Sequence, residues 1–354
     1  MTHFSELDTP AVIIDLDSAE ANLKKAQETA DKAGIALRPH IKTHKLPFFA
    51  QKQVALGAAG ITVQKLGEAE VMADAGLTDL LLTFNIIGAA KLKRLQALHG
   101  RVTIRTVADS PDCVAGLAGT FTNADHRLGV FVECDTGMGR CGVQSLAAAL
   151  ELARRIIAAP GLEFAGLMTY PAAGKYREAA QWLADAREVF ATAGVDLPVI
   201  TTGGTPDIWH MDEAARVATE YRPGTYIYMD RSQVAAGAAS FDECALTVLA
   251  TVVSRPTENR AIIDAGSKAL TSDLLGLIGH GHVVEFPDAK ITGLSEEHGT
   301  LDISACASKP KIGDVVRIIP NHCCPVTNLF DQVHLIRNGE LIQTMDVAAR
   351  GRVG

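Results

Sequence analysis

The chain has 354 residues, of which 47% are hydrophobic and 21% are charged. These fractions are typical of a globular protein, and the length accommodates a barrel of roughly 250 residues with a smaller second domain. The formal net charge of -8 disfavours binding to nucleic acid or to an anionic membrane. No stretch approaches the ~20 apolar residues that span a bilayer, and the N-terminus lacks the pattern of a secretory signal. We therefore expect a cytoplasmic protein with a small-molecule partner, in keeping with seven cysteines without disulfide-like spacing.

Short apolar runs alternate with amphipathic helical patterns from Leu37 to Tyr228, which is typical of an α/β fold. Ser18 is expected to cap a helix over Ala19–Ala33, and Ser145–Ala158 is expected to form another helix. Eight runs are interpreted as strands, the number that a closed (β/α)8 TIM barrel needs. They are Leu37–Lys42, Gly60–Gln64, Asp79–Asn85, Arg101–Thr106, Leu128–Asp135, Phe164–Tyr170, Pro198–Gly203 and Thr219–Tyr228.

After Asp230 the pattern changes to β-branched runs separated by turns, with little helical periodicity. The runs are Ala245–Arg255, Ala261–Asp264, Val315–Ile319 and Val333–Ile336, and the Asn-Gly pair in Arg337–Glu340 indicates a hairpin turn. The early run Ala11–Leu16 is surplus to the barrel and is expected to join this C-terminal sheet. We predict a barrel domain over residues 17–235 and a β-rich domain formed by residues 1–16 and 236–354.

The segment Arg38–Lys45 is the most informative part of the chain, because it places Lys42 where the first strand meets its loop. Active sites of barrels form at the C-terminal ends of the strands. A lysine there reaches into a pocket, and burial or nearby cations shift its amine toward neutrality, which suits Schiff-base chemistry. Taken alone, the segment leaves open an ordinary basic loop made of Lys42, His44 and Lys45.

Glycine-rich turns follow other predicted strands. Asp135–Gly142 carries Arg140 after the fifth strand, and Thr202–Thr205 follows the seventh, while Arg222–Thr225 lies in the eighth segment. Loops after strands seven and eight are the customary phosphate site of a barrel. A phosphate cradle there would neighbour Lys42 around a closed barrel, as the two ends of pyridoxal phosphate require. By itself, the Gly203-Gly204 pair is also compatible with a plain turn.

A third motif, Pro320–Pro325, follows the strand-like run Val315–Ile319. If the strand continues, His322 and Cys324 point to the same face, because side chains two residues apart do so. An imidazole and a thiolate at that spacing suit a zinc-like ion whose other positions are left to water or substrate. The alternative is a buried histidine beside small hydrophobic cysteines.

Together these motifs resemble the D-threonine aldolase and D-serine dehydratase family, which is of the alanine-racemase type. The resemblance extends from about Asp8 to the C-terminus and is carried by four segments: Arg38–Lys45, Gly60–Glu70, Asp135–Gly142 and Pro320–Pro325. It implies a barrel that binds pyridoxal 5'-phosphate, a C-terminal β domain and a homodimer.

The resemblance also implies roles for individual residues. Lys42 matches the Schiff-base lysine, and Arg140 matches the arginine that faces the pyridine nitrogen. His322 and Cys324 match the metal positions, with zinc favoured and manganese or magnesium as alternatives. His298 is a further catalytic candidate. The remaining cofactor-binding candidates are Gln64, Tyr170, Thr202, Gly203, Gly204, Gly224 and Thr225.

The implied substrate is a D-3-hydroxy amino acid. Because an arginine leaves the pyridine nitrogen unprotonated, the ring is a weak electron sink, and a metal on the β-hydroxyl would supply help as a Lewis acid. Loss of water would give a 2-keto acid and ammonia, whereas cleavage of the Cα–Cβ bond would give glycine and an aldehyde. Cys324 favours dehydration, since the family's aldolases tend to carry aspartate there. Retro-aldol cleavage is the alternative.

Two further classes share the barrel and the lysine. An amino-acid racemase would need a second base opposite Lys42 and no metal, so inactivation by a chelator would exclude it. A non-catalytic pyridoxal-phosphate carrier would lack the C-terminal β domain, so residues 240–354 argue against it.

Overall fold

The computed structural model describes residues 3–354, which divide into two compact units. The first, here called the barrel unit, comprises Lys25–Lys42, Leu46–Gly224 and Arg352–Gly354. The second, here called the β unit, comprises the residues up to Lys24, Thr43–Lys45 and Thr225–Gly351. Among residues 3–354, none of the helices combines the length and the apolar character needed to cross a membrane.

The barrel unit contains an eight-stranded parallel sheet in the order β2-β9-β8-β7-β6-β5-β4-β3. A parallel bridge between His40 and Thr62 joins the two edges, and Ile41 N donates to Thr62 O over 2.9 Å. The predicted (β/α)8 class is therefore confirmed. The strands are β2 (Ala36–Leu37), β3 (Ile61–Val63), β4 (Asp79–Leu82), β5 (Thr103–Ala108), β6 (Leu128–Cys134), β7 (Leu162–Thr169), β8 (Val199–Thr202) and β9 (Glu220–Tyr221).

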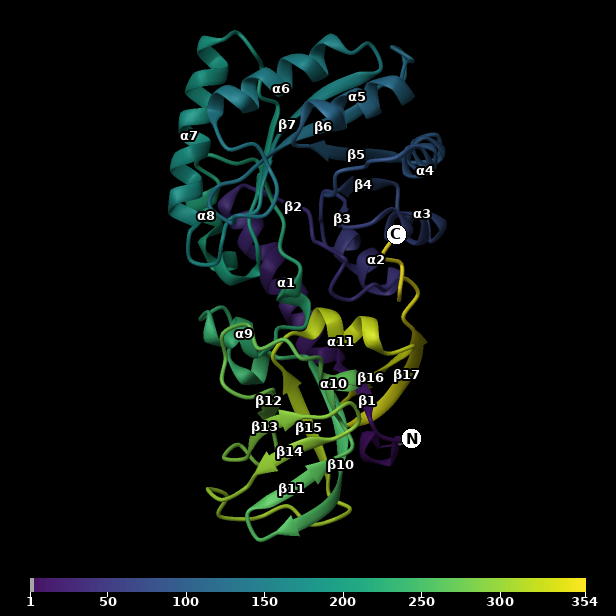
Figure 1. Cartoon of the computed structure of the whole chain (residues 1–354), viewed down its shortest axis with the longest axis vertical. Coiled ribbons are helices and arrows are strands. Elements are labelled where there is room, and N and C mark those ends of the chain that lie inside the picture. The colour runs from purple at the N-terminus through teal and green to yellow at the C-terminus, as the bar shows by residue number, and fades with distance from the viewer. Residues whose placement is uncertain (1–2) are drawn as a thin grey trace. The chain divides into compact units, whose positions relative to one another are not determined.

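Helices follow the strands and lie outside the curled sheet (Figure 1). Every residue of β6 is buried, as expected for a strand covered on both faces. The helices are α2 (Pro47–Ala55), α3 (Leu66–Asp74), α4 (Ala89–His99), α5 (Pro111–Thr120), α6 (Leu146–Ala158), α7 (Tyr176–Thr192) and α8 (Met211–Ala214), with the 3-10 helix η2 at Thr205–His210.

The first and last barrel strands are shorter than the sequence predicts. β2 ends at Leu37 instead of continuing to Lys42, and β9 ends at Tyr221 instead of continuing to Tyr228. Pro39 and Pro223 follow these ends, and a proline has no N–H to donate to a ladder. Lys42 consequently lies in a turn beyond the bridge at His40.

The two helix starts predicted from serine caps have different outcomes. Ser145 is the N-cap of α6, and its side chain accepts a hydrogen bond from Ala148 N. The prediction for Ser18 is wrong, because α1 (Leu16–Ala33) begins earlier and Asp15 accepts the Ser18 N–H over 3.0 Å. Asp15 is an equally good capping residue, and the prediction placed the start of the helix about one turn too late.

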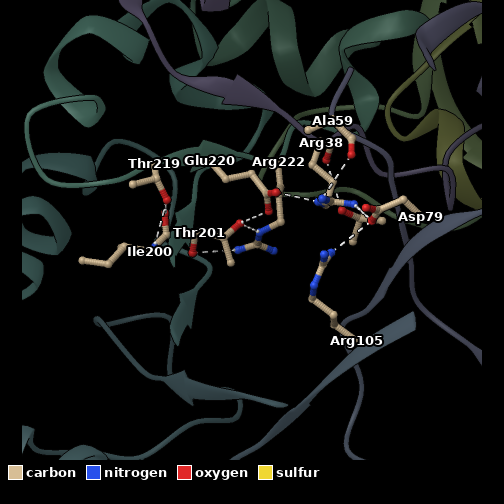
Figure 2. A network of polar contacts seen from close by, with 10 residues as sticks. Arg38, Ala59, Asp79, Arg105, Ile200, Thr201, Thr219, Glu220 and Arg222 are labelled. Atoms are coloured by element: carbon tan, nitrogen blue, oxygen red, sulfur yellow. Dashed lines mark hydrogen bonds and ion pairs between the residues drawn. The ribbon is translucent and has the colours of Figure 1, made fainter. Parts of the chain in front are cut away.

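A charged network joins several barrel strands (Figure 2). Arg38 donates to Glu220 on β9 and to Asp79 on β4, each over 2.6 Å. Asp79 also accepts from Arg105 on β5 over 3.0 Å, and Glu220 accepts from Thr201 on β8 over 2.7 Å. Arg38 and Glu220 are almost fully buried, so their charges are stable only because each has a partner.

The β unit contains a nine-stranded sheet in the order β11-β14-β13-β12-β15-β10-β1-β16-β17. β11 also pairs with β10, so six of these strands form a closed ring. The strands are β1 (Ala11–Asp15), β10 (Leu246–Thr257), β11 (Arg260–Ile263), β12 (Gly281–Val283), β13 (Lys290–Leu294), β14 (Gly299–Asp302), β15 (Val315–Pro320), β16 (Gln332–Arg337) and β17 (Glu340–Asp346).

Two sequence predictions for this unit are confirmed. β1 pairs antiparallel with β10 and parallel with β16, so the early run does join the C-terminal sheet. Asn338 and Gly339 have positive φ between β16 and β17, as a two-residue hairpin turn requires. The short helices of this unit are η1 (Phe4–Glu6), η3 (Thr225–Ile227), α9 (Arg231–Ala235), η4 (Phe241–Glu243), α10 (Ser267–Leu270) and α11 (Cys323–Leu329).

Candidate active site

In the barrel unit, Lys42 and Arg140 face the same aromatic ring. The Lys42 amine lies 5.8 Å from the centroid of the Tyr170 ring, and the Arg140 guanidinium lies 5.3 Å from it. Tyr170 directly follows β7, and Arg140 lies in the loop after β6. The structure thus brings three of the predicted site residues together at the C-terminal ends of the strands.

The turn that carries Lys42 is held by His40 and Gln64. His40 Nε2 lies 3.0 Å from Gln64 Oε1, and Gln64 Nε2 donates to Thr83 O over 2.8 Å. Because the Gln64 oxygen accepts, His40 carries its proton on Nε2 and leaves Nδ1 to accept the Lys42 N–H over 3.3 Å. Gln64 therefore supports the lysine turn; its predicted contact with the cofactor stays a prediction.

The loop that carries Arg140 is closed by Asp135. The Asp135 carboxylate accepts the N–H groups of Gly137 and Gly139 over 2.9 and 3.1 Å. Burial alone would raise the pKa of Asp135, but these backbone hydrogen bonds outweigh it and lower the pKa below its usual value. Gly142 has φ +115°, and a Cβ there would lie 2.4 Å from Asp135 N, so the glycine is required.

Glu133 lies beside Arg140 and is a residue that the sequence motif did not single out. It is 4% exposed on β6, and its Oε1 lies 3.9 Å from Arg140 Nη2. Burial raises the pKa of Glu133 to about 6, although the charge of Arg140 opposes this. The available sequence signal was a single carboxylate at the penultimate position of an otherwise uncharged strand, because a buried carboxylate there needs a cation.

Arg222, which follows β9, is hydrogen-bonded to the C-terminal ends of β7 and β8, and Figure 2 shows its contact with Thr201 on β8. Its Nε donates to Thr201 Oγ1 over 2.7 Å, and its Nη2 donates to Thr169 O. Thr169 Oγ1 in turn lies 2.7 Å from Thr136 Oγ1 in the Arg140 loop. Burial lowers the pKa of Arg222 to about 10, so the side chain remains a cation at neutral pH.

The predicted phosphate residues in the barrel unit gather around two tyrosine rings. A Cβ on Gly203 would lie 2.4 Å from the Tyr221 ring, and one on Gly204 would lie 3.0 Å from the Tyr170 ring. Tyr221 OH donates to Gly204 O over 2.9 Å. Thr202 O accepts from Arg222 N over 2.8 Å, and Gly224 N donates to Thr205 Oγ1 over 3.2 Å.

These residues fit pyridoxal phosphate. Gly203 has φ +96° and packs against the ring of Tyr221, and Gly204 packs against the ring of Tyr170, so a larger side chain at either position would press on a tyrosine ring. Lys42 and Arg140 supply an amine and a permanent cation around the same ring. The donor set therefore matches an aromatic aldehyde that carries a ring nitrogen and a phosphate.

In the β unit, His322 and Cys324 are neighbours, but not for the reason expected from the sequence. β15 ends at Pro320 and α11 begins at Cys323, so the predicted continuing strand is wrong. Cys324 lies in the first turn of α11 instead, and its side chain still hydrogen-bonds to His322. Its Sγ also lies 3.1 Å from the hydroxyl of Thr43, the residue after Lys42 in the sequence.

Electrostatics in this group favour a charged imidazole in the absence of a metal. Burial lowers the pKa of His322, but the hydrogen bond to and the charge of Cys324, together with Asp273, raise it to about 9. His322 Nδ1 lies 2.8 Å from Asp273 Oδ2. Asp230 accepts the Cys323 N–H over 3.0 Å and so fixes the start of α11.

His322 and Cys324 fit a metal site only if other molecules supply the remaining ligands. Imidazole and thiolate are the donors that zinc prefers, and the two side chains are in contact. Among residues 3–354, however, no group of three or more His, Cys, Asp or Glu side chains could hold a metal ion. The remaining coordination positions would fall to water or substrate.

Two other predicted residues lie in the β unit. Thr225 begins η3, and its hydroxyl lies 3.7 Å from Cys324 Sγ. His298 is exposed in the turn between β13 and β14, where its carbonyl accepts the Ser295 N–H. The phosphate role of Thr225 and the catalytic role of His298 stay predictions.

A barrel that carries a lysine and an arginine beside one ring, followed by a β unit, is the arrangement expected of a barrel enzyme of the pyridoxal-phosphate type. Residues 14–232 match the alanine racemase N-terminal domain, and residues 245–336 match the putative serine dehydratase domain. The chain is 35% identical to a D-threonine aldolase of Arthrobacter sp, over 98% of this chain and 94% of that protein.

Two further matches support the same family. The chain is 32% identical to a D-threo-3-hydroxyaspartate dehydratase of Delftia sp. (strain HT23), over 96% of this chain and 97% of that protein. The crystal structure of D-threonine aldolase from Filomicrobium marinum matches with a TM-score of 0.91 at 31% identity, over 99% of this chain and 97% of that one. The chain belongs to the D-threonine aldolase and D-serine dehydratase family of pyridoxal-phosphate-dependent lyases.

Proposed function

We propose that the protein is a metal-assisted lyase that removes water from D-3-hydroxy amino acids and releases a 2-keto acid and ammonia. The observation that carries this proposal is the arrangement around Tyr170, whose ring faces both the Lys42 amine and the Arg140 guanidinium. An amine for the aldehyde and an arginine for the ring nitrogen are the two groups that the family resemblance assigns to the pyridoxal-phosphate site.

Each barrel residue has a role in this proposal. Lys42 would hold the cofactor aldehyde, Arg140 would face the ring nitrogen, and Gly203 and Gly204 would receive the phosphate. Bound pyridoxal phosphate supplies the electron sink for bonds at the substrate Cα. The Lys42 amine, once released by the substrate, takes the Cα proton as a general base. The Arg140 guanidinium keeps its own proton, so the ring nitrogen stays unprotonated.

His322 and Cys324 would hold a divalent metal in the β unit. Zinc is the ion proposed, because one imidazole and one thiolate are soft donors; manganese or magnesium would exchange into a site open to water. The metal would supply Lewis-acid assistance to the β-hydroxyl of the substrate. The proposal also includes a homodimer, on the basis of the family resemblance, and a cytoplasmic location, on the basis of the sequence pattern.

Retro-aldol cleavage to glycine and an aldehyde is the second candidate. The similarity to D-threonine aldolase of Arthrobacter sp favours it, whereas Cys324 in place of an aspartate favours dehydration. Incubation with D-serine and D-threonine, with and without a chelator, distinguishes the two outcomes. Chelator-sensitive release of keto acid and ammonia supports dehydration, and glycine with an aldehyde as the sole products would reject it.

The lysine is tested separately from the reaction. Borohydride reduction of purified protein should fix the cofactor to the peptide that contains Lys42, which mass spectrometry identifies. Lys42→Ala should lose the visible absorbance of the lysine-bound cofactor. Lys175→Ala is the matched control, because Lys175 is an exposed barrel-unit lysine paired only with Glu178 in its described contacts. Retention of the absorbance by Lys42→Ala would reject the proposal at its first step.

A further inference from the structure

The loop between α10 and β12 carries an aspartate that reaches the proposed metal ligand. Asp273 Oδ2 lies 2.8 Å from His322 Nδ1, and the two side chains are 43% and 29% exposed. An imidazole that donates from Nδ1 to a carboxylate presents Nε2 as its lone-pair nitrogen. We infer that Asp273 is a positioning residue that fixes His322 with Nε2 available to a divalent metal; this inference rests on the proposed metal site.

The loop that bears Asp273 is held by the residue next to His322. Asn321 is 1% exposed, and its Nδ2 donates to the carbonyl of Asp273 over 3.1 Å and to that of Gly279 over 2.8 Å. Arg231 Nη1 donates to Asn321 Oδ1 over 3.0 Å. The backbone under the carboxylate is therefore tied to the backbone under the imidazole, which fixes their mutual orientation before any ion binds.

Asp273 acts through the histidine and is not itself a ligand. Its described side-chain contact is with His322 Nδ1, on the opposite side of the ring from Nε2. Among residues 3–354, it forms no cluster with His322 and Cys324 that could hold a metal through three side chains. A neighbouring carboxylate, Asp230, is occupied by the Cys323 and Gln233 N–H groups and so anchors α11 instead.

The test measures metal affinity rather than catalysis. Full-length holoenzyme is stripped of metal, and its zinc dissociation constant is measured by competition with a chromophoric chelator. D273N keeps the shape of the side chain but replaces the charged acceptor with an amide, and we expect affinity to fall about 10- to 100-fold. D273E restores a carboxylate and should bind more tightly than D273N. D288N, at an exposed aspartate of the same unit, is the matched control and should bind as wild type.

Cobalt substitution separates positioning from ligation. At saturating Co²⁺, D273N should show the same thiolate-to-cobalt absorbance band as wild type, because Cys324 and His322 still bind the ion. A displaced band at saturation would identify Asp273 as a ligand and overturn the inference. Equal weakening in D273E and D273N would mean that the loop, not the carboxylate, sets the affinity, and this result would also overturn it.

The inference and the proposed metal site fail in different ways. Wild-type zinc affinity in D273N, with affinity lost in H322N, would overturn the role of Asp273 and leave the site in place. Wild-type affinity in H322N would remove the site itself. Thermal unfolding of each metal-free variant verifies that the proteins compared are folded.

Discussion

Substituting Glu133 should make the stability of the barrel unit depend less on pH. Glu133 is 4% exposed, and burial raises its pKa from the ordinary 4.5 to about 6. The opposing charge of Arg140, 3.9 Å away, does not cancel this effect. The native state thus carries a carboxylate that resists ionisation, and Glu133→Gln replaces it with a neutral side chain of the same shape.

The magnitude follows from the two pKa values of Glu133. The difference between 4.5 and about 6 corresponds to about 2 kcal/mol, at ~1.4 kcal/mol per pH unit. Between these values the native state binds more protons than the unfolded state, so its free energy of unfolding falls as pH rises. Above the folded pKa, wild type bears the full free-energy cost of a charged, buried Glu133, and the variant bears none of it. Relative to wild type, Glu133→Gln should therefore gain about 2 kcal/mol between about pH 4 and pH 7.

Urea unfolding followed by tryptophan fluorescence measures this gain. Both tryptophans of the chain, Trp182 and Trp209, lie in the barrel unit, so the signal reports its unfolding. Glu188→Gln removes an exposed carboxylate from α7 and serves as the control, because it makes the same chemical change without relieving any burial. A difference between Glu133→Gln and wild type that stays constant from pH 4 to pH 7 would refute the assignment of a buried carboxylate with a raised pKa to Glu133.

Two further predictions concern the barrel framework. Arg38→Met removes the cation that is hydrogen-bonded to the buried Glu220 and should lower the free energy of unfolding by about 3–5 kcal/mol in urea titrations; a loss below about 1 kcal/mol would mean that the pair is solvated. Gly166→Ala would place a Cβ 1.8 Å from Val199 O and separate β7 from β8, so it should cause a large fall in melting temperature. Gly119→Ala, in open space on α5, should not lower it, and equal effects of the two alanines would contradict the packing argument.

The strand pattern predicted the barrel, but not the ends of its first and last strands. Continuous apolar runs indicated the interior strands because both faces of a parallel sheet are buried. Leu37–Lys42 also looks like a strand, yet β2 ends at Leu37, close to a proline that has no N–H to donate, and Lys42 lies in a turn. The prediction of a lysine at the strand end was nevertheless useful, because the bridge at His40 keeps that turn at the edge of the sheet.

The contact between His322 and Cys324 was expected from the sequence, but the strand argument behind that expectation was wrong. His322 and Cys324 are close in the sequence, so many backbone conformations would bring them together. The strand argument fails because α11 begins at Cys323, but the first turn of a helix also brings the two side chains into contact. Asp273 is 49 residues from His322, and neither hydrophobic period nor motif relates the two. Only the closed fold of the β unit reveals that contact.

Two of the groups with proposed chemical roles, Lys42 and His322, are oriented by neighbouring side chains. His40 and Gln64 fix the turn of Lys42, while Asp273 fixes the imidazole of His322. Lys42 and His322 carry the proposed reactive atoms, whereas the supporting residues set the angles at which those atoms meet a ligand. Changes in the supporting residues should consequently weaken cofactor or metal binding without changing the type of product. A support variant that exchanged keto acid for glycine among the products would show that orientation, and not ligand identity, selects the bond that breaks.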